Sequence, residues 1–161
     1  MKSGIVLSCI LGTLLALTSC RQHLEKEVVS TWPDGKPLKV QYYKKEGAKR
    51  TKVKEIRYYQ NGQKEMEGEY ADGKKTGLWT AWFESGLKQS EGHYENGLRN
   101  GKSVVWRRNG FKFYEGSYSK GKLHGTWIFY DTTGGRDKEV YFEHGEKIRE
   151  VLLSLSSPAK E

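Results

Sequence analysis

Short runs rich in aromatic and β-branched residues alternate with Gly-containing segments through most of the chain. Examples are 78–83, 104–106, 113–118 and 127–130. Runs of this length and composition are typical of β-strands, and none is long enough for a convincing helix. Asn-Gly or Asp-Gly pairs accept positive φ at low cost and mark hairpin turns. Such pairs occur at 34–35, 61–62, 72–73, 96–97, 100–101 and 109–110.

The pattern repeats every 24 residues. The segment 67–70 (Glu-Gly-Glu-Tyr) returns at 91–94 and 115–118, and weakly at 139–142. An earlier, looser copy aligns Trp32 with Tyr59 if about three residues are inserted within 44–52. Three good copies between two degraded ones are typical of a repeat array, because terminal units cap the stack. The positions that keep the step include the glycines Gly68, Gly73, Gly77, Gly92, Gly97, Gly101, Gly116, Gly121 and Gly125, the aromatics Tyr58, Trp82, Trp106 and Tyr130, and the basic residues Lys64, Lys88, Lys112 and Arg136.

Each repeat is predicted to contain two antiparallel strands and two turns. In one copy the first strand covers 78–83, a turn 84–87, the second strand 88–94 and a Gly-rich loop 95–101. We therefore expect an all-β fold: an elongated, single-layer antiparallel β-meander of tandem hairpins. A glycine within a strand weakens a sheet unless something packs over it. We expect a neighbouring aromatic ring to lie across the bare backbone at Gly68, Gly92 and Gly116.

Composition supports a thin sheet. The chain has 161 residues, enough for one domain, but its hydrophobic content is only 35%. All 20 aromatic residues lie between Trp32 and Phe142. Aromatic rings bury a large area and tolerate a wet edge, so they can hold a sheet that has no second layer. Their abundance also argues against disorder, since disordered segments are poor in aromatics.

The N-terminal segment is predicted to be a targeting signal. Lys2 precedes an apolar run, 4–17, that is too short to span a bilayer as a helix but suits a signal peptide. The run ends Leu-Thr-Ser-Cys, which resembles the bacterial lipobox. The resemblance implies cleavage before Cys20, acylation of its thiol and a lipid-anchored place on the cell membrane. The alternative is an ordinary secretory signal that leaves Cys20 as a free thiol. The remaining cysteine, Cys9, lies within the signal, so no disulfide is expected in the mature chain.

The expected organisation is a signal peptide at 1–19, a lipidated tether at 20–26, hairpin repeats at 27–147 and a C-terminal tail at 148–161. Arg21 stands where some Gram-negative lipoproteins carry an Asp that resembles an inner-membrane retention signal. An outer-membrane location is therefore preferred for a Gram-negative envelope.

The repeating pattern Glu-Gly-x-Tyr-x-x-Gly-x-x-x-Gly resembles the MORN repeat, and is closest to its bacterial variant with an aromatic-x-x-Asn-Gly-x-Lys step. That step reads Trp-Arg-Arg-Asn-Gly-Phe-Lys at 106–112. The resemblance covers about 55–147 well and 27–54 loosely. It implies a meander of hairpins with roles in protein contact and, in some members, membrane or phospholipid association. Many bacterial relatives carry a toxin–antitoxin label. The pattern is broken by Ser103 in place of a Trp, by Val140 in place of the strand Gly and by the insertion in 44–52.

Catalytic chemistry is not expected. The four histidines occupy unlike repeat positions, and no spacing suggests a metal site. The repeated Glu67, Glu91, Glu115 and Glu139 recur with the fold, whereas an active site usually occurs once. We interpret them as strand-face residues in cross-strand pairs with Lys or Arg. The sequence predicts neither an enzyme nor a cofactor.

The chain is instead expected to be an interaction module at the cell envelope. It carries a formal net charge of +8, with the densest basic cluster at 44–54. Export makes nucleic acid an improbable partner. One alternative is an envelope-structural protein that contacts anionic lipid through basic residues, and a second is an antitoxin-like protein. The candidate interaction surface for an envelope protein or peptide comprises Trp79, Trp82, Trp106, Trp127 and Tyr130.

Overall fold

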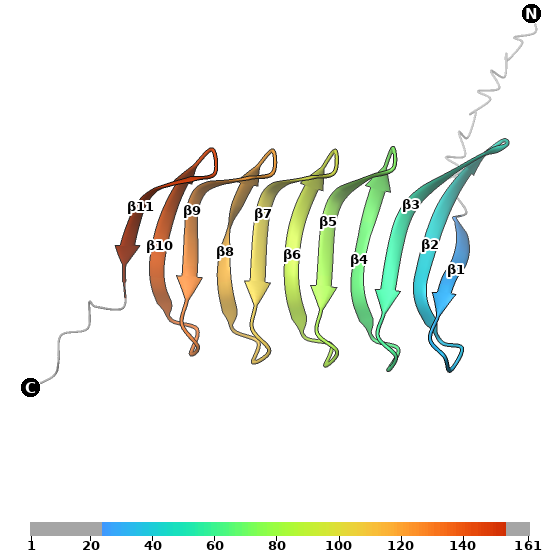
Figure 1. Cartoon of the computed structure of the whole chain (residues 1–161), viewed down its shortest axis with the longest axis horizontal. Helices are drawn as coiled ribbons and strands as arrows, with labels where there is room; N and C mark the ends of the chain where they lie inside the picture. Colours follow the sequence, from blue (N-terminus) through green and yellow to red (C-terminus); the bar gives the residue numbers. More distant parts are fainter. Residues whose placement is uncertain (1–23, 154–161) are drawn as a thin grey trace, which may run out of the picture.

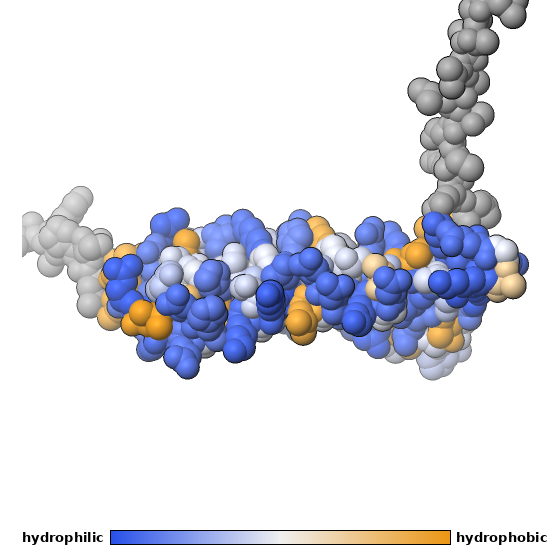
Figure 2. Space-filling view, turned by 90° about the horizontal axis from the view of Figure 1, so that it is seen from above, coloured by the Kyte–Doolittle hydropathy of each residue, from blue (hydrophilic) through white to orange (hydrophobic). Residues whose placement is uncertain are grey.

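In the computed structural model, residues 24–153 are described, and they form one antiparallel sheet whose eleven strands follow one another in space as in sequence (Figure 1). The sheet stays open and has a single layer, which confirms the predicted fold class. Seen from the side that carries the turns it is a thin slab, and most of the surface facing the viewer is hydrophilic (Figure 2). The strands are β1 (Glu25–Thr31), β2 (Pro37–Glu46), β3 (Lys49–Tyr58), β4 (Lys64–Ala71), β5 (Lys74–Trp82), β6 (Lys88–Glu95), β7 (Leu98–Trp106), β8 (Lys112–Ser119), β9 (Lys122–Tyr130), β10 (Arg136–Glu143) and β11 (Glu146–Leu152).

The sheet is longer than the predicted repeat region. β1 takes in residues 25–26, which were expected in the tether, and β11 takes in 148–152, which were expected in the tail. The predicted Gly-rich loop at 95–101 is also wrong. A two-residue turn at Asn96-Gly97 is followed at once by β7, which includes Gly101. The strand accommodates Gly101 at positive φ, close to a shift in register between β6 and β7.

The turns at the upper ends of the strands in Figure 1, here called the upper edge, share one geometry. Along the upper edge of Figure 1 both central residues of four turns have positive φ, which is the geometry of two-residue hairpins that match the strand twist. Those turns are Asp72-Gly73, Asn96-Gly97, Lys120-Gly121 and His144-Gly145. The β2–β3 hairpin, with ten residues in each strand, projects beyond them at the same edge (Figure 1). This extension accounts for the insertion predicted within 44–52.

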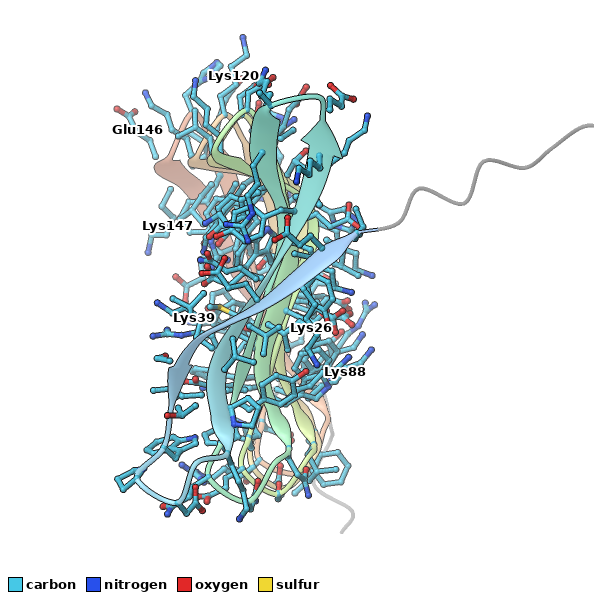
Figure 3. The ribbon with its side chains drawn as sticks, turned by 90° about the vertical axis from the view of Figure 1, so that its right-hand side faces the viewer. Lys26, Lys39, Lys88, Lys120, Glu146 and Lys147 are labelled. Atoms are coloured by element: carbon cyan, nitrogen blue, oxygen red, sulfur yellow. The ribbon has the colours of Figure 1, made fainter. Side chains whose placement is uncertain are left out.

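The two faces of the sheet differ in kind. Cross-strand partners share a face, so the register places Gly68, Gly92 and Gly116 together on one face, here called the glycine face. Glu67, Glu91, Glu115 and Glu139 lie on the opposite face, here called the glutamate face. Viewed along the sheet, Lys39 of the glycine face and Lys88 of the glutamate face point to opposite sides (Figure 3).

Indole rings cover bare backbone on the glycine face. A Cβ added to Gly68 would lie 2.1 Å from the Trp79 ring, and one added to Gly116 would lie 2.3 Å from the Trp127 ring. Each indole nitrogen also donates a 3.1 Å hydrogen bond to a strand carbonyl, that of Glu69 or Ser117. The expected ring over glycine is thus confirmed at two positions. At Gly92 it is wrong, because the nearest atoms belong to Arg99, Ser103 and Tyr94 at 3.6–3.8 Å.

Hydrogen bonds link each hairpin to the next at both edges. At the upper edge the N–H groups of Gly97, Gly121 and Gly145 donate to carbonyls of the preceding hairpin at 2.8–2.9 Å. At the lower edge a side chain in the turn reaches the aromatic strand end of the next hairpin. Tyr59 Oη donates to the Trp82 carbonyl, and Arg107 Nη2 donates to the Tyr130 carbonyl, both at 2.8 Å. These bonds add to the backbone ladders that join neighbouring hairpins.

The strand glycines give a matched test of the packing. Gly68→Ala drives a methyl group into the Trp79 ring and is expected to lower the free energy of unfolding by about 1–3 kcal/mol. Gly92→Ala has ordinary van der Waals room, so it is expected to be neutral or stabilising by up to about 1 kcal/mol. Urea unfolding followed by tryptophan fluorescence measures both. Equal losses in the two variants would show that the indole is not what requires glycine.

Candidate interaction surface

Aromatic rings and cations alternate in one row along the glutamate face. At the lower end of each hairpin an aromatic side chain is the cross-strand partner of a basic one, and the basic group also approaches the next ring. Lys64 Nζ lies 5.7 Å from the Trp82 ring centre and Lys88 Nζ lies 5.9 Å from that of Trp106. These distances fall within cation–π range. The cross-strand pairs are Tyr58 with Lys64, Trp82 with Lys88, Trp106 with Lys112 and Tyr130 with Arg136.

The glutamates form the next row, and each one is paired. The pairing is largely within a strand: Lys88 with Glu91 and Lys112 with Glu115 are three residues apart, and the other two copies repeat this. The prediction of cross-strand pairs is therefore only partly right, because cross-strand contacts occur from Lys54 to Glu67 and from Lys102 to Glu115. A bulge at each turn turns the lysine back along its own strand, which brings it beside the carboxylate.

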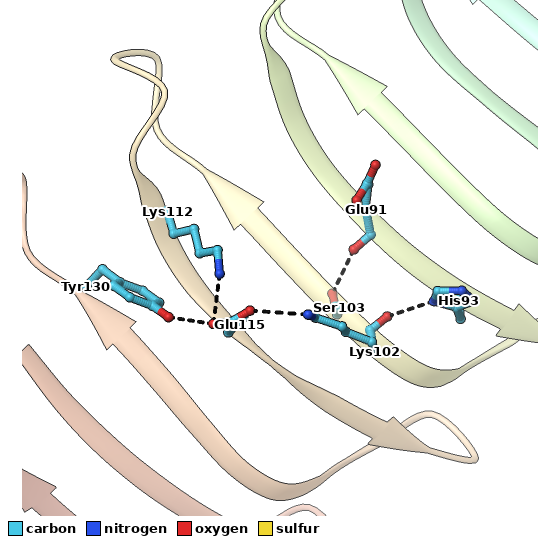
Figure 4. A network of polar contacts seen from close by, with 7 residues as sticks. All are labelled: Glu91, His93, Lys102, Ser103, Lys112, Glu115 and Tyr130. Atoms are coloured by element: carbon cyan, nitrogen blue, oxygen red, sulfur yellow. Dashed lines mark hydrogen bonds and ion pairs between the residues drawn. The ribbon is translucent and has the colours of Figure 1, made fainter. Parts of the chain in front are cut away.

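Two of these glutamates are held in their ionised form. Burial alone would raise the pKa of Glu115, but hydrogen bonds from Tyr130 and Lys112 outweigh it and lower that pKa. The pKa of Glu67 is lowered in the same way, with Lys54 and Lys64 as donors. Burial and the bond to Glu115 raise the pKa of Tyr130. Figure 4 shows this network around Glu115, with Tyr130, Lys112 and Lys102 converging on one carboxylate.

Shallow hollows recur beside the aromatic row. One, of about 180 Å³, lies between Leu78, Val104 and Trp106. Another, of about 250 Å³, lies one repeat earlier between Lys54, Thr80 and Trp82. Each is smaller than the pockets that enclose drug-sized ligands. Such hollows suit single side chains of a partner, one for each repeat, better than a whole small molecule.

The structure divides the five predicted surface residues between the two faces. Trp79 and Trp127 lie on the glycine face and are only 5% and 3% exposed, so they belong to the packing. Trp82, Trp106 and Tyr130 lie together on the glutamate face and are half-buried. The sequence did not separate the two groups, because a residue's face depends on whether its distance along the strand is odd or even and on where bulges fall.

Sequence reasoning gave no role to Lys75 and Arg99, which occupy one position in successive repeats on the glycine face. Lys75 Nζ lies 3.9 Å from the Trp79 ring centre, and the Arg99 guanidinium carbon lies 5.2 Å from that of Tyr118. Burial lowers the pKa of Lys75. Their 24-residue spacing was the signal that could have identified them.

The basic cluster at 44–54 is largely neutralised within the sheet. Arg50 pairs with Glu25 and Glu27 of the neighbouring strand β1. Lys44, Lys52 and Lys54 each pair with a glutamate as well. The hairpin therefore presents much less free positive charge than its sequence indicates.

Residues 24–153 offer neither a metal site nor a membrane-spanning helix. These residues contain no group of three or more His, Cys, Asp or Glu side chains arranged to hold a metal ion. The same stretch also has no helix long and apolar enough to cross a membrane.

The pH dependence of stability tests the Glu115 network. A carboxylate whose folded pKa is depressed stabilises the fold above the unfolded pKa, about 4.3, and this contribution is lost as pH falls through the folded pKa. Tyr130→Phe removes one donor, so the folded pKa of Glu115 should rise and the acid-dependent loss of stability should shrink. Carboxyl NMR titration and urea unfolding at a series of pH values measure the two effects. Tyr58→Phe, at the equivalent position three repeats earlier, is the control and should leave the Glu115 titration unchanged.

Comparisons with known proteins leave the family open. No protein-family model matches the chain, and no curated protein matches it. Among solved structures, it is similar to a protein of unknown function from Bacteroides fragilis NCTC 9343, with 13% identity over 81% of this chain and 93% of that one. The TM-score is 0.20, so this likeness carries no argument about fold or function.

Proposed function

We propose that the chain is a non-catalytic, lipid-anchored interaction module of the cell envelope, whose glutamate face binds an extended segment of another protein. The observation that carries the proposal is the row of half-buried aromatic rings alternating with cations along that face. Aromatic and basic side chains held in place by a rigid sheet lose little conformational entropy on binding, which favours them as anchors.

The spacing of the row supports an extended ligand. Equivalent aromatic residues are two strands apart, which is about 10 Å, and an extended chain rises about 3.3 Å per residue. In the extended polyproline II conformation, with three residues per turn and a rise of about 3.1 Å per residue, every third side chain faces the same side, so such a segment would present one side chain to each aromatic position. Acidic or apolar side chains at those positions would meet the cations or the rings. The shallow hollows beside Trp82 and Trp106 would take the intervening contacts.

The anchor remains a proposal from the sequence. The signal segment 1–19 and Cys20 lie outside the described residues, and β1 begins at Glu25, five residues after that cysteine. Acylation at Cys20 would hold the sheet within about 20 Å of the membrane surface. The MORN resemblance, which includes a meander of hairpins and roles in protein contact, agrees with this proposal and is part of it.

The two alternatives have less support. Contact with anionic lipid would need unpaired positive charge. Most basic residues of the 44–54 cluster are instead ion-paired with glutamates of the sheet. An antitoxin of a cytosolic toxin would not carry an export signal. Both remain separate outcomes of the experiments below.

Site-specific photocrosslinking in cells tests the binding face. A photoreactive residue at Lys88 or Lys102, on the glutamate face, is expected to give discrete protein adducts. The same residue at Lys39, on the glycine face, should not. Trp82→Ala with Trp106→Ala should reduce the adducts at least about tenfold, as expected for loss of aromatic anchors. Leu98→Ala, which removes an exposed side chain outside the row, is the matched control. Adducts that are unchanged in the double variant would contradict the proposal.

Lipid anchoring is tested separately. Growth with labelled palmitate should label the wild-type chain and leave Cys20→Ser unlabelled, and globomycin should cause the uncleaved form to accumulate. Fractionation of the cell envelope then shows which membrane holds the labelled chain. A wild-type chain that is cleaved but unlabelled would indicate the ordinary secretory signal, and a labelled Cys20→Ser variant would show that acylation occurs at another residue.

A further inference from the structure

One repeat unit of the glycine face lacks the tryptophan ring that covers the strand glycine in its neighbours. Gly68 and Gly116 lie under Trp79 and Trp127, but the equivalent residue for Gly92 is Ser103, which is 1% exposed and too small to cover it. A Cβ added at Gly92 would meet nothing closer than 3.6 Å. A solvent-open hollow of about 110 Å³ lies over this glycine.

In the terminal units the position equivalent to the strand glycine is occupied by a side chain that fills the space. In the first unit Gln41 faces Glu55, and its amide donates a 2.7 Å hydrogen bond to that carboxylate. In the last, Val140 fills its own place where β11 supplies no tryptophan. Among the three equivalent glycines Gly68, Gly92 and Gly116, Gly92 is therefore the one with no indole over its backbone.

Arg99 occupies part of the missing ring's space. Trp79 lies between Tyr70 and Tyr94, at 5.3 and 6.0 Å, and Trp127 lies similarly next to Tyr118 at 5.1 Å. The Arg99 guanidinium lies between Tyr94 and Tyr118, at 5.7 and 5.2 Å from their centres. Its Nη1 donates a 3.1 Å hydrogen bond to Ser103 Oγ, which donates in turn to the Glu91 carbonyl.

Two cations border the hollow outside ion-pair distance of any carboxylate in residues 24–153, although Glu91 also lines it and Glu55 raises the pKa of Lys75 from farther away. Lys75 and Arg99 both line it, and neither forms an ion pair within residues 24–153. This differs from the glutamate face, where every lysine of the aromatic row has its own glutamate. Trp79 and Tyr94 supply two aromatic walls, and Ala81 and Gly92 supply a flat floor.

We propose that this vacancy binds a planar aromatic ring that carries a carboxylate. The ring would lie over Gly92 as the indoles lie over Gly68 and Gly116, displacing Arg99 Nη1, which is 3.6 Å from a Cβ built at Gly92, and the carboxylate would pair with Arg99 and Lys75. The fit follows from the protein's own pattern: flat backbone that elsewhere receives an indole, and positive charge that elsewhere receives an acid. Such a ligand is either the C-terminal aromatic residue of a protein or a free aromatic acid. The site lies on the face opposite to the proposed peptide surface and does not depend on it.

NMR titration of the full chain tests the site. N-acetyl-tryptophan is expected to shift the Gly92 amide and the Arg99 Nε–H resonance in a saturable way. N-acetyl-tryptophanamide, which has the ring without the charge, should bind at least about tenfold more weakly because it loses the charge-assisted pairs. The peptide Ala-Ala-Trp with a free carboxylate distinguishes the sources. Binding equal to that of N-acetyl-tryptophan indicates a protein C-terminus, and much weaker binding indicates a free acid.

Two variants complete the test. Ser103→Trp supplies the missing indole and should abolish the shifts while raising the midpoint of thermal unfolding. Lys75→Gln with Arg99→Gln keeps the hollow and should bring the affinity for the acid down to that for the amide. Lys120→Trp, at an exposed turn, controls for an added tryptophan. Absence of saturable shifts at Gly92 in the wild-type protein, or shifts that survive in both variants, would overturn the proposal.

Discussion

A sheet with no second layer must bury its backbone with side chains from its own surface, and the indole lying on glycine is how this protein does it. Trp79 and Trp127 each replace a missing opposing layer: the ring closes over a strand whose glycine lets it approach, and its N–H bonds a strand carbonyl. Because the ring and the glycine belong to adjacent strands, a side chain at the glycine position would displace the ring. The same requirement explains why glycine and tryptophan recur with one period along the chain.

This constraint also separates the two faces by function. On the glycine face the aromatic rings are used up in packing, and Trp79 and Trp127 are nearly inaccessible. On the glutamate face the backbone is covered by small buried side chains such as Thr80 and Val104, so Trp82 and Trp106 stand above it with their edges free. A face whose own stability does not depend on its exposed rings can offer them to a partner.

The sequence predicted the strands and the hairpin repeat because period, turn residues and aromatic runs all act locally. It could not predict the strand that begins directly after Asn96-Gly97, because Gly101 resembles a turn glycine and only the bulge between β6 and β7 shows that it sits within a strand. Nor did the Asn-Gly rule identify the turns at Lys120-Gly121 and His144-Gly145, where the repeat imposes positive φ on unfavoured residues. Trp79 and Trp82 lie three residues apart in one strand, so strand alternation alone places them on opposite faces, and the predicted interaction surface did not take this into account.

Linear architecture makes a local exception tolerable. The pairing of strands runs only between neighbours in sequence, so the stability of such an array is close to a sum over units and their shared edges. Loss of one indole at Ser103 is therefore a local cost, and Arg99 offsets part of it by stacking between Tyr94 and Tyr118. In a compact core, loss of an indole would leave an enclosed cavity that adjacent side chains could not fill by changing conformation. In an open sheet the gap can instead remain as an accessible hollow. It is bordered by Lys75 and Arg99, which form no ion pair within residues 24–153.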